Sequence, residues 1–222
     1  MQDMKVTAII LAGGKNLRLG RTKAIETIGG KSIIERVIER VRPLASQILI
    51  VTSTDRVKQL ASQVLLVTGV KRTDLLLRLK DDAEFLTDLY PGYGPLGGIY
   101  TGLVASRTSH SIAVACDMPF LNTKLLGYMV EQAGDFDAVV PRLDGGMIEP
   151  LHAIYSRNCL EPIRERLESK QLSVEKFIKA LRVRYIEQAE SQRIDPKLLS
   201  FFNINYQADL ERAIAIEAEE NG

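Results

Sequence analysis

Glycines and cations gather in one short segment, residues 11–23, that directly follows an apolar run. Gly13 and Gly14 allow the backbone to approach a ligand closely and to point N–H groups at phosphate oxygens. Arg18 can donate two parallel hydrogen bonds to a phosphate, and Lys23 adds a mobile positive charge. The segment fits neither the P-loop pattern G-x-x-x-x-G-K-[ST] nor the dinucleotide pattern G-x-G-x-x-G. Its glycines and cations predict a phosphate-binding loop of another kind. The alternative is a tight turn with two exposed cations.

A second candidate, Asp117, directly follows the apolar run 112–116. A carboxylate at the end of a buried strand lies near the glycine-rich segment when both strands are central in one sheet. Mg²⁺ prefers one or two carboxylates together with substrate phosphates and water, and it neutralises the charge that develops as pyrophosphate leaves. Asp117 therefore predicts a magnesium site, and the alternative is a carboxylate that caps a turn before Pro119.

The elements that must position these residues follow the pattern of a mostly parallel sheet, because short apolar runs alternate with amphipathic stretches. Uninterrupted apolar runs such as 6–11 are typical of strands buried on both faces. The strands are predicted at 6–11, 48–51, 64–67, 111–116, 138–141, 151–155 and 183–186. The helices are predicted at 32–38, 55–61, about 95–107, 123–133 with Thr123 as N-cap, 157–168, 174–180 and from 207 onward. Residues 68–83 are interpreted as a helical insertion or lid, or as a surface helix packed on the sheet.

Composition limits the class of protein. The chain has 222 residues with 45% hydrophobic and 26% charged content, which supports a sizeable core and argues against disorder. Its 29 Lys and Arg nearly balance 28 Asp and Glu, so no basic excess points to nucleic acid or a membrane surface. Two cysteines outside any C-x-x-C pair favour a reducing cytoplasm. Without a signal peptide or a span of roughly 20 apolar residues, the protein is expected to be soluble.

Other reactive residues give weaker signals. His110 and His152 have no second ligand at metal spacing, so a zinc site is not expected, and His152 is interpreted as a strand residue beside a pocket rather than a base. Cys116 lies in an apolar strand and is interpreted as a buried structural thiol. Glu149 either contacts a second substrate or contacts no substrate, and the sequence favours neither alternative.

Motifs spread over almost the whole chain resemble those of the molybdenum cofactor guanylyltransferases, also called molybdopterin-guanine dinucleotide synthases. The first motif is shared with sugar-nucleotide pyrophosphorylases and cytidylyltransferases, and the last two narrow the resemblance. The resemblance implies an α/β, Rossmann-like nucleotidyltransferase fold, with a mostly parallel sheet flanked by helices on both faces. The motifs are L-A-G-G-x-x-x-R-x-G-x-x-K at 11–23, G-P-L-G-G at 94–98, C-D-M-P at 116–119, E-P-L-H-A-I-Y at 149–155 and F-F-N-I-N at 201–205.

The same resemblance implies that GMP is transferred from GTP to molybdopterin in the presence of Mg²⁺. Arg18, Lys23 and Asp117 would be the catalytic residues, and Asp117 would bind the metal. The chain would form one domain, with a nucleotide-binding half at about 1–120 and an acceptor-binding half at about 121–222. A transient protein that delivers molybdopterin is a further expected partner. The residues expected to contact the substrates are Leu11, Ala12, Gly13, Gly14, Lys23, Thr52, Asp88, Gly94, Gly98, Asn203 and Asn205.

The sequence departs from the family pattern at two positions. Thr22 stands where the family commonly has Asp, and Thr52 begins a Thr-Ser-Thr run where the family tends to have Asn. Because the second position helps to hold the nucleoside, the choice between GTP and CTP stays open. The alternatives are therefore a related enzyme that uses CTP or another phosphorylated acceptor, and a nucleotide-binding regulator without turnover.

Overall fold

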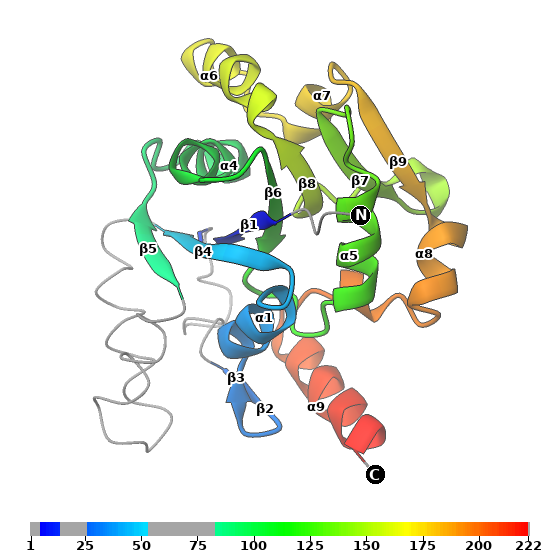
Figure 1. Cartoon of the computed structure of the whole chain (residues 1–222). Helices are drawn as coiled ribbons and strands as arrows, with labels where there is room; N and C mark the ends of the chain where they lie inside the picture. The colour runs from blue at the N-terminus through cyan, green and yellow to red at the C-terminus, as the bar shows by residue number, and fades with distance from the viewer. Residues whose placement is uncertain (1–4, 14–25, 53–82, 222) are drawn as a thin grey trace.

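A computed structural model describes residues 5–13, 26–52 and 83–221 of the chain, and its centre is a seven-stranded sheet (Figure 1). The strand order is β5-β4-β1-β6-β8-β7-β9. All neighbouring strands are parallel except β8, which runs antiparallel to β6 and β7, so the predicted mostly parallel sheet is confirmed. The strands are β1 Val6–Leu11, β4 Ala45–Thr52, β5 Glu84–Thr87, β6 His110–Ala115, β7 Ala138–Arg142, β8 His152–Ser156 and β9 Val183–Glu187.

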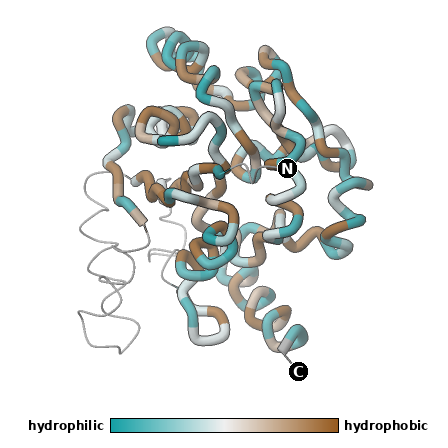
Figure 2. Tube along the Cα trace, in the orientation of Figure 1, coloured by the Kyte–Doolittle hydropathy of each residue, from teal (hydrophilic) through white to brown (hydrophobic). Residues whose placement is uncertain are grey.

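Helices cover both faces of this sheet (Figure 1). Along β1, Ala8 and Ile10 pack on one face, and Ile9 and Leu11 pack on the other. Both faces are apolar because successive side chains of a strand point to opposite sides. Figure 2 shows the resulting apolar residues through the middle of the molecule. One face carries α1 Ile33–Val41, α5 Thr123–Glu131 and α8 Gln188–Ile194, and the other carries α4 Gly94–Ala105, α6 Leu160–Glu168 and α7 Val174–Ile178.

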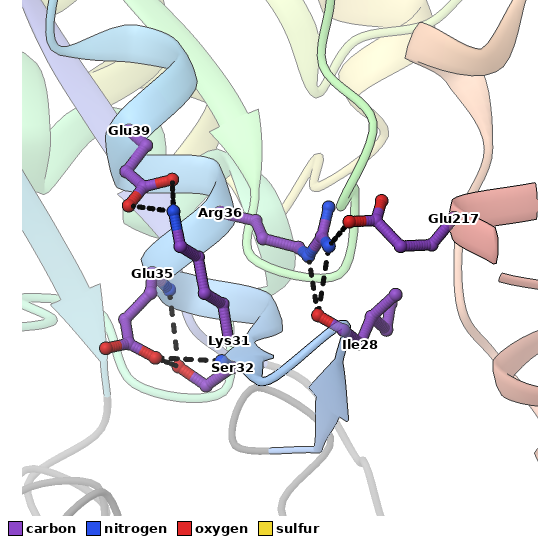
Figure 3. Close-up of polar contacts among 7 residues, drawn as sticks. All are labelled: Ile28, Lys31, Ser32, Glu35, Arg36, Glu39 and Glu217. Carbon is purple, nitrogen blue, oxygen red and sulfur yellow. Dashed lines mark hydrogen bonds and ion pairs between the residues drawn. The ribbon is translucent and has the colours of Figure 1, made fainter. Parts of the chain in front are cut away.

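The start of α1 is fixed by local hydrogen bonds (Figure 3). Ser32 caps the helix by accepting from the Glu35 amide, and its own amide donates to the Glu35 carboxylate at 2.8 Å. This reciprocal arrangement is the capping box that a Ser-x-x-Glu sequence predicts. Before it, β2 Thr27–Ile28 and β3 Lys31–Ser32 form a small antiparallel ribbon. This ribbon leads directly into the capped start of α1.

A buried ion pair joins this entry to the last helix, α9 Gln207–Asn221. Arg36 donates to the Ile28 carbonyl through Nε (3.0 Å) and Nη2 (2.9 Å), and it pairs with Glu217 of α9 (Figure 3). A Cβ on Gly29 would lie 2.8 Å from the Glu217 carboxylate, so a larger residue would displace the paired side chains, and its φ of +58° also favours glycine. Arg36 thus ties the turn between β2 and β3 to the C-terminal helix.

Some predicted details are corrected or fall elsewhere. Asn122, not Thr123, caps α5, because its side chain accepts from two amides of the first turn while the Thr123 hydroxyl donates to the Arg40 carbonyl at 2.8 Å. The sequence did not predict β5 or α8. The elements predicted at 55–61 and 64–67, and the insertion up to residue 82, lie outside the described residues. Short 3₁₀ turns complete the fold: η3 Asp144–Gly146, η4 Arg157–Cys159 and η5 Leu199–Phe201.

Among the described residues, no helix is long and apolar enough to cross a membrane. Cys116 and Cys159 are both buried thiols. Burial raises the pKa of the Cys159 thiol to about 12, and the nearby Asp137 carboxylate adds to that shift. A thiol with such a pKa stays protonated at neutral pH, so Cys159 has a packing role.

Candidate functional site

A cleft of about 810 Å³ lies at the carboxyl edge of the sheet. From β1 the chain builds outward through β4 and β5, and then crosses through α4 to β6 on the other side of β1. The strand order therefore reverses beside β1, and open α/β sheets bind ligands at such a switch point. Because β8 is antiparallel, the residues just before it reach the same edge as the carboxyl ends of β1, β4 and β6.

Most of the sequence-predicted site residues meet in this cleft. Ala12 lies behind the lining, 3% exposed, with its amide donating to the Val51 carbonyl at 2.9 Å. Gly14, Arg18 and Lys23 lie outside the described residues. The predicted residues that line the cleft are Leu11, Gly13, Thr52, Asp88, Gly94, Gly98, Asp117, Asn203 and Asn205.

The first turn of α4 forms one wall. Gly94 has φ +68°, a conformation that favours glycine, and Pro95 occupies the first turn, where its missing N–H costs nothing. No side chain in the described part of the chain caps this helix, so the amides of its first turn are not used by a cap from these residues. Helix N-termini of this kind bind anions through amides and dipole. A Cβ on Gly98 would lie 2.9 Å from the Leu11 side chain, so the glycine lets α4 approach β1 closely.

Two predicted residues at the ends of β4 and β5 are fixed by hydrogen bonds. The buried Thr52 hydroxyl donates to the Ala12 carbonyl at 3.0 Å. The Asp88 amide donates to the Thr52 carbonyl at 2.9 Å, and Asp88 Oδ1 accepts from the Thr101 hydroxyl and the Tyr90 amide, both at 3.0 Å. Both of these bonds involve Oδ1, so they fix the carboxylate at the edge of the cleft.

Asp117 lies on the other side, next to the segment that contains both asparagines. The Ile204 amide donates to the Asp117 carbonyl at 3.0 Å, which joins this segment to the end of β6. The Asn203 side-chain amide nitrogen donates to the Phe201 carbonyl at 3.1 Å, and this bond orients the amide group. Asp117 therefore lines the same cleft as Asn203 and Asn205, although it precedes them by 86 and 88 positions in the chain.

His152 anchors this segment from behind. Its Nε2 lies 2.6 Å from the Ser200 hydroxyl oxygen, which also accepts from the Asn122 amide at 2.9 Å. The Ser200 amide donates to Asp195 at 2.8 Å, and the Phe201 ring packs edge-on against the imidazole at 4.8 Å between centroids. Burial lowers the pKa of His152 from 6.5 to about 4. The histidine is fully buried and outside the cleft lining, so it positions neighbours and does not act as a base.

The structure adds a residue that no sequence motif indicated. Val174, at the start of α7, lines the cleft although nothing in its local sequence marks it. Glu149, which begins the motif at 149–155 and whose contact the sequence left open, also lines the cleft, and burial raises the pKa of its carboxyl. Tyr90 packs against Tyr93 and Tyr100 at centroid distances of 5.7 and 5.5 Å, which agrees with packing within the loop.

The charges of the described lining are all negative, from Asp88, Asp117 and Glu149. An anionic substrate therefore needs cations from elsewhere, and the segment 14–25 contains Lys15, Arg18, Arg21 and Lys23. No group of three or more His, Cys, Asp or Glu that could hold a metal occurs in the part of the chain that the structure describes. One carboxylate with carboxamide oxygens nearby suits a hard cation that keeps water and substrate phosphates as its other ligands.

Several known proteins and one family of domains are similar in sequence to this chain. The family described as the MobA-like NTP transferase domain matches residues 8–185. A probable molybdenum cofactor guanylyltransferase of Pelotomaculum thermopropionicum is 32% identical over 210 residues, which cover 95% of this chain and 92% of that protein. A molybdenum cofactor guanylyltransferase of Desulfosudis oleivorans is 38% identical over 135 residues, which cover 60% of this chain and 66% of that protein.

A solved structure extends the likeness to the fold. The crystal structure of molybdopterin-guanine dinucleotide biosynthesis protein A from Archaeoglobus fulgidus matches with a TM-score of 0.76 and 28% identity. The match covers 96% of this chain and 100% of that one. The sequence match, the shared fold and the cleft at the switch point lead to one conclusion: the chain belongs to the MobA-like NTP transferase family.

Proposed function

We propose that this protein transfers GMP from GTP to molybdopterin, releasing pyrophosphate and forming a molybdopterin guanine dinucleotide. The observation that carries the proposal is the single cleft that residues from distant motifs line, from Leu11 to Asn205. The names of the relatives support the same reaction. The family resemblance of the sequence motifs points to the same pair of substrates.

In this proposal GTP lies against β1, β4, β5 and the start of α4, and the acceptor lies against β6, β8 and residues 203–205. The nucleotide-binding half is then about 1–120, and the acceptor-binding half about 121–222. Backbone amides at Gly13 and Gly14 face the phosphates, while Thr52 and Asp88 lie beside the nucleoside. Leu11, Ala12, Gly94 and Gly98 shape the surface on which the nucleotide rests.

Charge stabilisation is the main task of the side chains. The terminal phosphate of molybdopterin is already an anionic nucleophile, so its attack on the α-phosphorus of GTP needs no general base. Arg18 and Lys23 hold the triphosphate in line and stabilise the pyrophosphate that leaves. Asp117 would hold Mg²⁺, with Asn203 and Asn205 orienting its ligands or the acceptor phosphate. When bound, Mg²⁺ neutralises the charge that develops on the leaving pyrophosphate.

Two further parts of the proposal concern the compartment in which the protein works and the delivery of molybdopterin. Buried cysteine thiols are typical of a reducing compartment, which favours the cytoplasm. A labile pterin substrate also favours transient transfer from a delivering protein, rather than diffusion through solvent.

The test is pyrophosphate release by the purified protein with Mg²⁺, molybdopterin and each of GTP, CTP, ATP and UTP. We expect release with GTP alone. We expect Asp117→Asn to lower the rate by about 10²–10³-fold, by analogy with the loss of a group that stabilises transition-state charge. Circular dichroism of the variant verifies that its fold is intact.

Each other outcome has a distinct meaning. Release with CTP in place of GTP would mean that the protein catalyses the same reaction with another nucleotide. Thr52, which stands where the family tends to have Asn, raises this alternative. The absence of pyrophosphate release with all four nucleotides would reject molybdopterin as the acceptor. Tight GTP binding in that case would favour a regulator without turnover. Full activity of Asp117→Asn would reject the metal role of that carboxylate.

A further inference from the structure

Glu149 occupies a rigid position at the start of β8. Its amide donates to the Pro141 carbonyl at 3.1 Å, and its carbonyl accepts from the His152 amide at 3.1 Å. The next carbonyl, of Pro150, accepts from the buried Tyr155 hydroxyl at 2.9 Å. These bonds fix the backbone on both sides of Glu149, so its carboxylate is presented to the cleft from a defined point.

This carboxylate is held without a partner in the described ranges 5–13, 26–52 and 83–221. It is half-buried, its neighbours in the lining include the apolar Pro150, Leu151 and Val174, and no described side chain or amide donates to it. Burial raises the pKa of this carboxyl because its charged form is less well solvated there. The position is therefore suited to a ligand that brings N–H donors.

The proposed substrates restrict which ligand group that is. Their phosphates carry negative charge and would be repelled by a carboxylate. A 2-amino-4-oxo-pyrimidine edge, by contrast, presents a ring N–H and an amino group side by side, which match the two oxygens of one carboxylate. Both molybdopterin and guanine carry this edge, so the fold must decide between them.

Strand order favours the pterin. Glu149 precedes β8, whereas Thr52 ends β4, and β4 and β8 are separated by β1 and β6. At about 4.8 Å between neighbouring strands, the two positions lie roughly 14 Å apart across the sheet. Building on the proposed function, we propose that Glu149 accepts hydrogen bonds from the ring N–H and the 2-amino group of the acceptor's pterin, and so selects the acceptor.

The test compares 6-hydroxymethylpterin with 6-hydroxymethyl-lumazine, in which an oxo group replaces the 2-amino group. Binding of each to the whole protein is followed by the fluorescence of the pteridine ring. We expect the wild-type protein to bind the pterin about 10–100-fold more tightly, as for a hydrogen-bonded pair with one charged partner. Glu149→Gln should reduce this preference to about threefold or less.

Asp144→Asn is the matched control, because Asp144 is an exposed carboxylate in the same β7–β8 connection and outside the cleft lining. It should keep the full preference for the pterin. Equal binding of the two pteridines by the wild-type protein would overturn the inference without requiring any variant to fold. An unchanged preference in Glu149→Gln would overturn it as well.

A second arm separates the pterin from guanine. The KM for GTP and for ITP, which lacks the 2-amino group, is measured in wild type and in Glu149→Gln. We expect the same ratio of the two KM values in both proteins, and a changed ratio would assign Glu149 to guanine. Pterin selectivity that depends on Glu149, in a protein that transfers no GMP to molybdopterin, would reject the proposed function and keep the inference.

Discussion

The two sides of the cleft are held in place by different means. On the side that we propose for the nucleotide, called the nucleotide side below, α4 lies directly on β1 because Gly98 and Gly102 have no side chains, and the Thr52 hydroxyl bonds to the backbone at Ala12. On the side that we propose for the acceptor, called the acceptor side below, the segment that leads to Asn203 is held by buried polar side chains around His152. One side depends on close packing and backbone hydrogen bonds, and the other on a side-chain network.

This difference has a physical consequence. Glycine packing and backbone hydrogen bonds do not titrate, whereas the pKa of a buried imidazole differs between the folded and unfolded chain, so its contribution to stability depends on pH. A surface made largely of backbone and glycines suits a triphosphate, which every nucleotide shares. Side chains of different chemistry suit the discrimination of one acceptor. We therefore expect pH and side-chain identity to affect mainly the acceptor side, and three variants test this contrast.

The largest effect is expected from acid through His152. Its pKa is about 4 in the folded protein, against 6.5 as the ordinary value. Between these values the unfolded chain binds the proton and the folded one does not, so the free energy of unfolding falls as pH is lowered from 6.5 to 4. The full contribution, about 3 kcal/mol, is present above pH 6.5. Urea unfolding at pH 7 and pH 4.5 measures it.

His152→Gln isolates this contribution, because glutamine can still bond to Ser200 and does not titrate. The variant should lose most of the difference in stability between the two pH values, while His110→Gln, at a less buried histidine, should keep most of it. If His152→Gln retained the wild-type pH dependence, other groups would carry it, and the contrast between the two sides would fail.

The second variant, Gly102→Ala, tests packing on the nucleotide side. A Cβ at this position would lie 2.4 Å from Cγ2 of Ile9, which is fully buried and cannot move aside freely. We expect a loss of about 1–3 kcal/mol in the free energy of unfolding, equal at pH 7 and pH 4.5. Thermal and urea unfolding at both pH values would measure it.

Gly127→Ala in α5 provides the comparison for that measurement. Its Cβ would meet Leu44 at 3.5 Å, an ordinary contact, and alanine is the better helix former by roughly 1 kcal/mol. The variant should be as stable as the wild type or more stable. A similar loss of stability in both variants would show that any added methyl group is harmful, and close approach of α4 to β1 would lose its special role.

The sequence predicted residues at the ends of strands better than contacts between distant segments, for a local reason. The end of β1 and Gly13 are adjacent in the chain, and Asp117 directly follows an apolar strand, so short patterns reveal them. His152 and Ser200 are 48 residues apart, and no periodicity indicates that they meet. The cap at Asn122 was missed because Thr123 is an equally good capping residue whose hydroxyl bonds to α1 instead. Strand β5, Glu84–Thr87, is too short and too exposed to give a clear pattern.

The smallest expected effect belongs to Thr52→Val, which removes one hydroxyl and keeps the side-chain shape. The Ala12 carbonyl would lose its bond at 3.0 Å from that hydroxyl in a buried position, at a cost of about 1 kcal/mol that does not change with pH. Thr87→Val, at the exposed end of β5, should change stability by less than about 0.5 kcal/mol. Because only one neutral hydrogen bond is involved, a loss near 3 kcal/mol, or one that grows in acid, would mean that the nucleotide side also depends on a polar network. The two sides would then differ only in which residues they use.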